Sequence, residues 1–385
     1  MNVLVINCGS SSVKFEVVDT SKKKCLVKGH VDGVGLDSCV FRFGDESEKV
    51  FLKNHDEALN LVLKKLDLST IQGIGHRFVH GGSHYNKPVL LTSKVISDLE
   101  KLNELAPLHN PHNLAGIRAC AGKTGVPQVA VFDTAFYSEL PEKVYTYALH
   151  KDLIKKHKLR KYGFHGISHN YLVEQTKELL AREKINLISC HLGNGSSVSC
   201  IKNNKCVETS MGFTPLEGLV MGTRSGDVDP GLVLFLQNKL KLSNSDVNDL
   251  LNKKSGLKGL TGKSDMRSVY EDVLNNDNDA SLALDIFCHR LVKYIGSYLA
   301  AMQDETHALV FSAGIGEGAF YVRKKVCDSL KHLGVVIDYD KNMADKGLIK
   351  KPKIISSSDS KIKVLVIPTY EELMIALETE SLLSK

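Results

Sequence analysis

The chain has 385 residues, of which 43% are hydrophobic and 24% charged, as in a globular protein long enough for two domains. Its 50 basic and 44 acidic side chains give a net charge of +6, which suits small anionic ligands and argues against nucleic acid. Nine cysteines without a C-x-x-C pair indicate reduced thiols and no zinc site. Without an N-terminal leader or a bilayer-length apolar stretch, we expect no membrane association and a cytoplasmic location.

The first predicted element is a β-hairpin. Val3–Ile6 and Val13–Val18 are apolar or alternating runs, and residues 7–12 (NCGSSS) form a small polar turn between them. Glycine lets the backbone approach a ligand closely, and successive backbone N–H groups can hold an anion. Two further strands, over Cys25–Val31 and Cys39–Phe43, extend the predicted meander.

Three chemically active side chains follow at the ends of predicted elements. Arg77 lies beside paired glycines at the end of a short strand and can make bidentate contact with phosphate or carboxylate. His109 lies in the loop before a helix that we expect Asn110 to cap. Asp133 directly follows a buried strand over Val129–Phe132. Taken alone, Arg77 is better interpreted as a surface salt bridge, whereas a turn cap and a catalytic role are equally good interpretations of Asp133.

The pattern of the first hairpin returns half a chain later. Residues 185–201 (INLISCHLGNGSSVSCI) predict two strands around a glycine-rich turn, in which Asn194, Ser196 and Ser197 add donors to an anion nest. An ordinary hairpin turn is the alternative for this stretch alone. The recurrence of the hairpin pattern about half a chain later indicates duplication of a whole domain.

The second half of the chain adds further candidate site residues. His165 precedes a helix start near Ser168, and Arg224 is a second loop arginine. A strand, a glycine loop over residues 313–318 and a helix through Leu333 have a nucleotide-site layout, although neither G-x-G-x-x-G nor a P-loop is present. Glu371 ends the last strand as a candidate metal ligand.

The predicted helices complete this outline. They cover Asp56–Leu66, Val95–Leu105, Pro230–Leu240, Ser243–Leu251 and Ala280–Met302. The apolar positions of the last one recur every three or four residues, which predicts packing and not a cofactor site. Glycine turns, loop arginines and histidines, and strand-end carboxylates are together the parts of a phosphoryl-transfer site.

The chain resembles the acetate kinase family, within the acetate and sugar kinase/actin/heat-shock chaperone superfamily. The matching segments are NCGSSSVKF, GHRFVHGG, APLHNP, VFDTAF, YGFHGISH, HLGNGSS, GFTPLEGLVMGTRSGDVDP, SDMR, SAGIGEG and IPTYEELMIA, in family order and nearly end to end. The resemblance implies an α/β fold with two duplicated actin-like (ribonuclease H-like) domains, mixed sheets flanked by helices, and a central cleft. Residues 1–148 plus 368–385 would form the N-terminal domain on the acyl and magnesium side. Residues 149–367 would form the C-terminal domain, with the nucleotide side and the dimer interface.

The resemblance also implies an activity. It is reversible in-line phosphoryl transfer between ATP and acetate, giving ADP and acetyl phosphate, with Mg²⁺ or Mn²⁺, by a cytoplasmic homodimer. A propionate or butyrate kinase and a pyrophosphate-dependent relative are the alternatives within the family. A catalytically dead relative would lack cleft residues that this chain retains.

The resemblance assigns roles to individual residues. The metal ligands would be Asn7 and Glu371. The catalytic residues would be Arg77, His109, Asp133, His165 and Arg224. The acyl group would lie among Arg77, Val79, Leu108, Phe164 and Pro215. The nucleotide and its phosphates would meet Ser10, Ser12, Lys14, His191, Asn194, Gly195, Asp265, Met266, Arg267, Gly314, Ile315 and Gly316.

Five positions depart from the family pattern: Ser83, His112, Tyr137, Gly318 and Tyr370. None of them replaces a residue assigned to the chemistry, but the last two leave the nucleotide side less closely matched than the acyl side. We expect alanine at either loop arginine to lower turnover by orders of magnitude with little loss of stability, because these arginines would neutralise charge and not pack.

Overall fold

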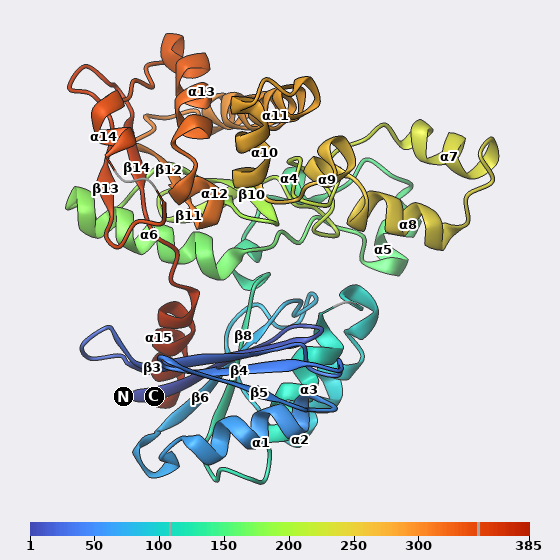
Figure 1. The fold of residues 1–385 in the computed structure, drawn as a ribbon, viewed down its shortest axis with the longest axis vertical. Helices are drawn as coiled ribbons and strands as arrows, with labels where there is room; N and C mark the ends of the chain where they lie inside the picture. The colour runs from blue at the N-terminus through green and yellow to red at the C-terminus, as the bar shows by residue number, and fades with distance from the viewer. Residues whose placement is uncertain (108, 345–346) are drawn as a thin grey trace. The chain divides into compact units, whose positions relative to one another are not determined.

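The computed structural model describes residues 1–107, 109–344 and 347–385 and divides the chain into two compact units (Figure 1). The first unit comprises Met1–Ser138, Gly166–Ser168 and Tyr370–Lys385, and the second comprises Glu139–His165 and His169–Thr369. The first boundary thus precedes the expected one at residues 148 and 149. Tyr145 and Tyr147 belong to the second unit because they bond to Lys161 and Glu217 of that unit.

The first unit is built on an eight-stranded sheet within the described residues, in the order β5-β4-β3-β2-β1-β6-β8-β7. Its strands are β1 Asn2–Cys8, β2 Ser12–Asp19, β3 Lys24–Asp32, β4 Cys39–Phe43, β5 Glu46–Val50, β6 Gly73–Phe78, β7 Val89–Leu90 and β8 Gln128–Phe132. The first five strands form an antiparallel meander, of which the sequence predicted the first four strands, and β1, β6 and β8 are parallel.

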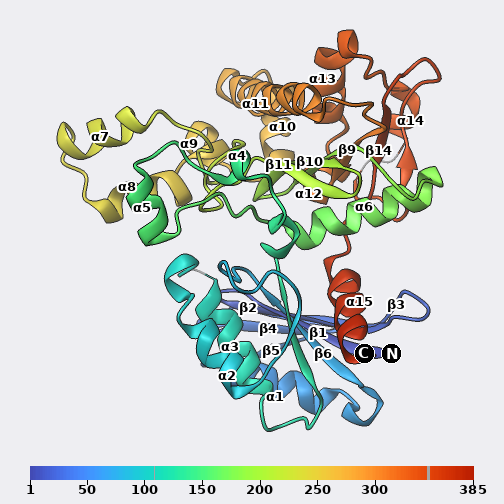
Figure 2. The same cartoon turned by 180° about the vertical axis from the view of Figure 1, so that it is seen from behind.

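Helices cover both faces of this sheet. They are α1 His55–Lys65, α2 Ser93–Glu100, α3 Asn110–Cys120 and α15 Glu371–Leu383, with short 3₁₀ turns at Leu68–Thr70, Asn103–Leu105 and Ala135–Tyr137. The α1 and α3 helices pack on the face that carries Leu4 and Ile6. The α15 helix approaches β6 so closely that a Cβ on Gly75 would lie 2.5 Å from Thr379 Oγ1. Both chain ends meet here (Figures 1 and 2), where the Met1 amine lies 3.0 Å from Glu380.

The second unit repeats this plan. The described residues form a six-stranded sheet in the order β11-β10-β9-β12-β14-β13. Its strands are β9 Leu187–Leu192, β10 Ser196–Lys202, β11 Lys205–Thr209, β12 Ala308–Ser312, β13 Lys353–Ile354 and β14 Lys363–Val366. The order matches β3-β2-β1-β6-β8-β7, and the parallel and antiparallel pairs also match. The expected fold of two duplicated domains with mixed sheets is therefore confirmed.

Helices surround the second sheet. They are α4 Glu142–Tyr145, α5 Lys151–His157, α6 Gly166–Leu180, α7 Pro230–Asn238, α8 Asn244–Lys253, α9 Gly256–Thr261, α10 Met266–Leu274, α11 Asn278–Met302, α12 Ala313–Gly318, α13 Phe320–Leu330 and α14 Tyr339–Met343, with a 3₁₀ turn at Lys331–Leu333. The periodic stripe of α11 is buried in the main core, as predicted. All nine cysteines are free thiols.

Three local predictions were wrong. The helix predicted over Val95–Leu105 ends at Glu100 and resumes as a 3₁₀ turn. Asn110 does not cap α3 but is its first residue, and its side chain bonds to backbone elsewhere. The glycine loop at 313–318 is the short helix α12, and the buried Arg323 guanidinium donates to the carbonyls of Gly316 and Glu317 in its last turn at 2.8 and 2.6 Å.

Candidate active site

The turn between β1 and β2 exposes small donors at one end of the first sheet. Asn7 pairs with Lys14 across the hairpin, and Gly9 N–H donates to Ser12 C=O at 2.8 Å. Ser10 and Lys14 are exposed, whereas His55 Nε2 lies 2.7 Å from the Gly9 carbonyl and holds the turn from behind. The turn is therefore fixed in shape while Ser10 and Lys14 face solvent.

Arg77, Asp133 and Glu371 come together at the end of the first sheet. Arg77 lies near the end of β6, Asp133 directly follows the parallel neighbour β8, and Glu371 is the first residue of α15. Arg77 Nη2 donates to Asp133 Oδ2, and Arg77 Nε lies 3.5 Å from Glu371 Oε2. The exposed fractions of the three side chains are 17%, 1% and 19%. Charge neutralisation and partial desolvation are thus built into one site.

The Asp133 carboxyl has an unusual environment. Burial raises its pKa to about 6, while the Arg77 charge acts in the opposite direction. Its Oδ1 atom is buried and makes no hydrogen bond. A carboxyl that changes protonation near neutral pH and keeps one oxygen unused can interact with a ligand or an ion.

Two asparagines that sequence reasoning did not assign to the site hold this edge together. Asn113 accepts from Val79 N–H at 3.0 Å and donates to the Cys8 carbonyl at 2.8 Å, so it joins the ends of β6 and β1. Asn110 bonds to both the N–H and the C=O of His80 at 3.1 Å. Their i, i+3 spacing on one face of α3 was the signal available in the sequence.

In the second unit, the β9–β10 turn lies against His165 and Arg224. A Cβ built on Gly195 would lie 3.3 Å from His165 Nε2 and 3.4 Å from Arg224 Nη1, so both side chains converge on this glycine. His165 precedes α6 in the left-handed region at φ 59°, which costs about 1 kcal/mol for a residue with a side chain. The ring of His191 stacks on that of His165 with centroids 4.3 Å apart. Such a strained placement is typical of functional positions.

Arg224 differs from Arg77 in its partners. Its Nη1 donates to the Pro215 carbonyl at 3.3 Å, and no carboxylate pairs with it among the residues that the structure describes. Burial lowers the pKa of its guanidinium. A half-buried arginine without a counter-charge is suited to bind an anion.

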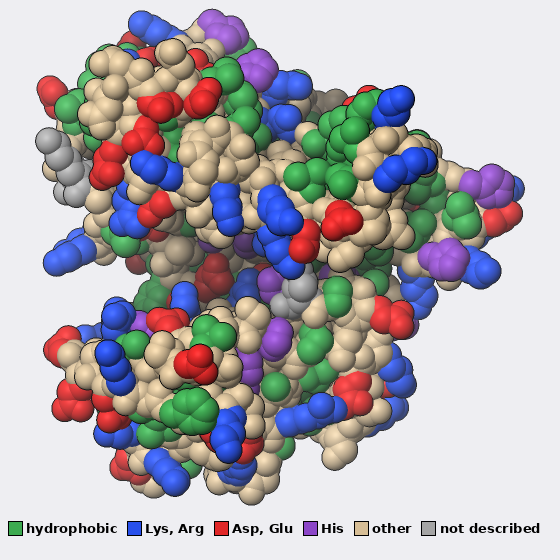
Figure 3. All heavy atoms as spheres, turned by 45° about the vertical axis from the view of Figure 1, so that its right-hand side comes forward, with side chains coloured by type: hydrophobic (Ala, Val, Ile, Leu, Met, Phe, Trp, Pro, Cys, Tyr) green, Lys and Arg blue, Asp and Glu red, His purple; other side chains and the backbone are tan. Residues whose placement is uncertain are grey.

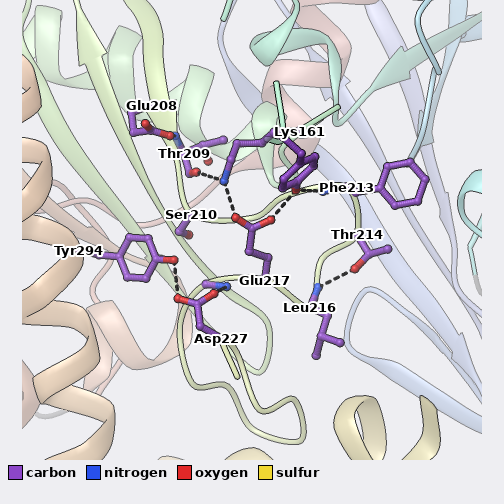
Figure 4. A network of polar contacts seen from close by, with 12 residues as sticks. Lys161, Glu208, Thr209, Ser210, Phe213, Thr214, Leu216, Glu217, Asp227 and Tyr294 are labelled. Carbon is purple, nitrogen blue, oxygen red and sulfur yellow. Dashed lines mark hydrogen bonds and ion pairs between the residues drawn. The ribbon is translucent and has the colours of Figure 1, made fainter. Parts of the chain in front are cut away.

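A polar network anchors the segment that carries Pro215 and Arg224 (Figure 4). Glu217 bonds to Lys161 Nζ at 2.8 Å and accepts from the Tyr147 hydroxyl. Asp227 accepts from Gly218 N–H and from the Tyr294 hydroxyl, each at 2.7 Å. This segment lacks regular secondary structure, so these side chains take over the role of fixing its conformation. The sequence analysis identified none of them.

A pocket of about 630 Å³ opens beside the same glycine turn. Six residues predicted for nucleotide binding line it: Asn194, Asp265, Met266, Arg267, Gly314 and Ile315. Phe320 and Tyr321 of α13 form part of its wall and were not predicted, although two adjacent aromatic residues after a glycine-rich segment were a visible signal. The departure Gly318 also lines the pocket, and Tyr370 instead bonds to Glu16 of β2.

The remaining predicted site residues lie as follows. Gly316 is outside the pocket lining and packs on the backbone of Phe311. His109 directly precedes α3, and Leu108 lies outside the described residues. Among the acyl-site candidates, Val79 belongs to the first unit and is buried. Phe164 and Pro215 belong to the second unit, where Phe164 is buried and Pro215 half-buried.

Two further observations concern the charges on the molecular surface and the length of the helices. Figure 3 shows basic and acidic side chains interspersed over the face in view, without a continuous basic stripe on either unit. Within the described ranges, no helix is long and apolar enough to cross a membrane.

The repeated sheets and the paired glycine turns define a protein of the actin-like fold class. Residues 2–377 match the model of the acetokinase family. The acetate kinase of Thermotoga maritima is 46% identical, covering 100% of this chain and 99% of that protein, and an acetate kinase of Desulfitobacterium hafniense is 47% identical over 100% of both. The chain therefore belongs to the acetokinase family, as its motifs predicted.

Solved structures agree with this assignment. The acetate kinase of Porphyromonas gingivalis aligns with a TM-score of 0.92 and 41% identity over 99% of both chains. A propionate kinase from Francisella tularensis aligns with a TM-score of 0.92 and 40% identity, also over 99% of both. The fold and family are thus settled. The two solved structures are named for different acids, acetate and propionate, although they match this chain equally well.

Proposed function

We propose that the protein is an acetate kinase that transfers a phosphoryl group reversibly between ATP and acetate. An acetate oxygen would attack the γ-phosphorus of ATP while the bond to the bridging oxygen of ADP breaks, giving acetyl phosphate and ADP. The observation that carries the proposal is the second unit's pocket, which opens beside a glycine turn where His165 and an arginine without a carboxylate partner converge. Phosphoryl transfer needs mainly such positioning and charge neutralisation.

The residues would divide the work between the two units. Ser10, Ser12 and Lys14 would contact phosphate oxygens, as would Asn194 and Gly195 of the second turn. Arg77 and Arg224 would neutralise the transferring group, with His165 donating to it, His109 supporting it and Asp133 orienting Arg77. Val79, Leu108, Phe164 and Pro215 would enclose the acyl methyl group. The nucleoside would lie along Asp265, Met266, Arg267, Gly314, Ile315 and Gly316, with His191 behind the turn.

Magnesium, or manganese, would bind at the first unit near Asn7 and Glu371. The available donors are amide and carboxylate oxygens, and the buried Asp133 Oδ1 makes no hydrogen bond, which suits a nearby cation. Within the described ranges no cluster of three or more His, Cys, Asp and Glu could hold a metal by itself. Few protein ligands are typical of magnesium, which takes its remaining ligands from water and phosphate and neutralises phosphate charge.

The protein would act as a cytoplasmic homodimer. The second unit's α7 exposes large apolar side chains: Leu232, Leu234 and Phe235 are 44%, 59% and 51% exposed. In Figure 1, α7 and α8 extend away from the second sheet, so this apolar helix lacks cover within its own unit. A second copy of the chain would bury it. The free thiols suit a reducing compartment.

A hydroxamate assay for acyl phosphate tests the function. We expect product from acetate with ATP, and much less with pyrophosphate in place of ATP. Propionate and butyrate should react more weakly, because each methylene in a closed acyl pocket changes the transition-state free energy by roughly 1–3 kcal/mol. A higher kcat/KM for propionate than for acetate would replace acetate by propionate as the substrate. Activity with pyrophosphate alone would contradict the role given to the pocket.

A further inference from the structure

A chain of side-chain contacts leads from His165 into the interior of the second unit. His165 Nδ1 lies 2.9 Å from Ser197 Oγ, and the same oxygen lies 2.8 Å from His169 Nε2. On the other side of that ring, His169 Nδ1 lies 2.6 Å from Ser189 Oγ. Ser197, His169 and Ser189 are completely buried. Protons along this chain are therefore shielded from bulk water.

Regular elements hold the four residues in place. His165 and His169 are one turn apart at the start of α6, where His169 N–H donates to the His165 carbonyl at 3.0 Å. Ser189 lies on β9 and Ser197 on its antiparallel neighbour β10. Side chains on packed elements keep their geometry better than side chains on loops.

Two arrangements keep the hydroxyl proton of Ser197 within this chain. The single hydroxyl proton of Ser197 can be donated to only one of the two histidines, so Ser197 accepts a hydrogen bond from the other. If Ser197 donates to His165 Nδ1, the neutral His165 carries its proton on Nε2. If His165 Nδ1–H donates to Ser197, the Nε2 atom of a neutral His165 is bare.

The surroundings of His165 favour the first arrangement. Its Nε2 edge faces Gly195 and Arg224, where an anionic phosphoryl group is proposed to bind. A bare Nε2 would repel that anion, whereas Nε2–H donates to it. A doubly protonated ring beside the Arg224 guanidinium would suffer like-charge repulsion. Burial and the neighbouring His191 lower the pKa of His169 well below its ordinary value, so His169 stays neutral and donates at only one of its nitrogens.

We propose that Ser197 is a positioning residue that, with His169 and Ser189 behind it, keeps neutral His165 protonated on Nε2 as a hydrogen-bond donor to the transferring phosphoryl group. This deepens the proposed function and rests on it. No bond to phosphorus is made by these residues, and no proton leaves the chain. The alternative is a purely structural role, in which the serines only satisfy a buried histidine.

Nuclear magnetic resonance of the full-length protein with ¹⁵N-labelled histidine tests the tautomer directly. In the absence of substrates at neutral pH, we expect the His165 signals, assigned by their loss in His165→Gln, to report protonation at Nε2. Ser197→Ala should give a mixture of the two tautomers. Ser199→Ala is the matched control, because Ser199 is equally buried two residues further along β10, where its hydroxyl lies 3.1 Å from Thr209 Oγ1. A wild-type His165 protonated on Nδ1, or an unchanged tautomer in Ser197→Ala, would overturn the proposal.

Kinetics separate positioning from packing. We expect Ser197→Ala to lower kcat about 10- to 100-fold, as loss of an orienting partner does, with KM for ATP and acetate within about twofold. Ser197→Thr, which keeps the hydroxyl, should retain most of the activity, and Ser199→Ala all of it. A Ser197→Ala enzyme with the wild-type kcat would overturn the proposal. If that variant does not fold, Ser189→Ala provides the same two measurements.

Failure of the proposed function has a different signature. A wild-type protein that makes no acyl phosphate from acetate and ATP would reject the activity. The histidine spectra would still show whether Ser197 sets the His165 tautomer. The two hypotheses are therefore distinguished by one preparation of protein.

Discussion

Matching places in the two sheets carry different chemistry. His76 pairs with Ile6 in the first sheet, and Phe311 pairs with Cys190 in the second. Ile6 and Cys190 each precede their turn glycine, Gly9 or Gly193, by three residues. One residue further along the central strand stands Arg77 in the first unit and Ser312 in the second.

The strands that follow show the same contrast. Asp133 directly follows β8 in the first unit, and Thr369 holds the corresponding place after β14 in the second. The first unit thus brings an ion pair to the end of its sheet, while the second has small neutral side chains there. Arg224, the cation of the second unit, comes instead from an irregular segment and has no carboxylate partner within the described residues. Duplication preserved the framework, and the charges were distributed differently.

The largest expected effect on turnover comes from substitution of Arg224. Arg224→Ala should lower kcat/KM by about a thousandfold, because a cation that neutralises the transferring group is lost. The free energy of unfolding should stay within about 0.5 kcal/mol of the wild type, since Arg224 has no carboxylate partner among the described residues and its loss leaves no buried charge uncompensated. Turnover and chemical denaturation measure the two effects. Arg224→Lys is the control that keeps the positive charge without the planar guanidinium group. Near-normal activity in Arg224→Ala would reject the role of Arg224 in neutralising the transferring group.

Arg77→Ala should combine a similar loss of turnover with a loss of stability. Removing Arg77 leaves the buried Asp133 carboxyl without its cation, which costs about 3–5 kcal/mol in comparable pairs. The expectation from sequence that both arginines could be removed without loss of stability therefore applies to Arg224 alone. The double variant Arg77→Ala/Asp133→Asn should regain stability but not activity. Equal denaturation midpoints for Arg77→Ala and the wild type would contradict the difference between the two arginines.

A smaller effect is expected at the turn of the second unit. Gly195→Ala places a methyl group 3.3 Å from His165 Nε2 and 3.4 Å from Arg224 Nη1, so one of them must shift. We expect kcat to fall up to about 10-fold, because the shift required is a few tenths of an ångström and a misplacement of about 1 Å costs about 100-fold. Gly296→Ala on α11, where a Cβ meets open space, is the control. Steady-state kinetics that leave Gly195→Ala unchanged would show that the convergence on Gly195 has no catalytic role.

The last expected effect is on the pH dependence of stability and not on turnover, and it comes from the central strand of the first unit. Burial lowers the pKa of His76 to about 4, below its ordinary 6.5, so the unfolded chain binds more protons between these values. Stability therefore rises with pH across that window, and His76 contributes roughly 3 kcal/mol of the loss on acidification from pH 7 to 4. The denaturation midpoint of His76→Gln, whose side chain cannot titrate, should fall less steeply on acidification from pH 7 to 4 than that of the wild type. An identical slope would mean that folding does not shift the pKa of His76.

Local chemistry in the sequence was sufficient for much of the framework. The two hairpins, the parallel strand before Asp133 and the long helix through Met302 follow from alternation and helical spacing, which act over a few residues. The glycine turns and the loop arginines were visible as candidates for the same reason. The recurrence of one hairpin pattern half a chain later was enough to predict the duplication.

Tertiary structure decided how the candidates are used. Only contacts between residues far apart in the chain show that Arg77 lies beside a carboxylate and that Arg224, within the described residues, does not. The same holds for the hydroxyl contacts of His165 and for the aromatic wall of the pocket. Periodicity determines which face of an element is buried, because it depends on neighbours along the chain. The partner of a buried polar side chain depends on which elements pack together, and a local pattern carries no information about that.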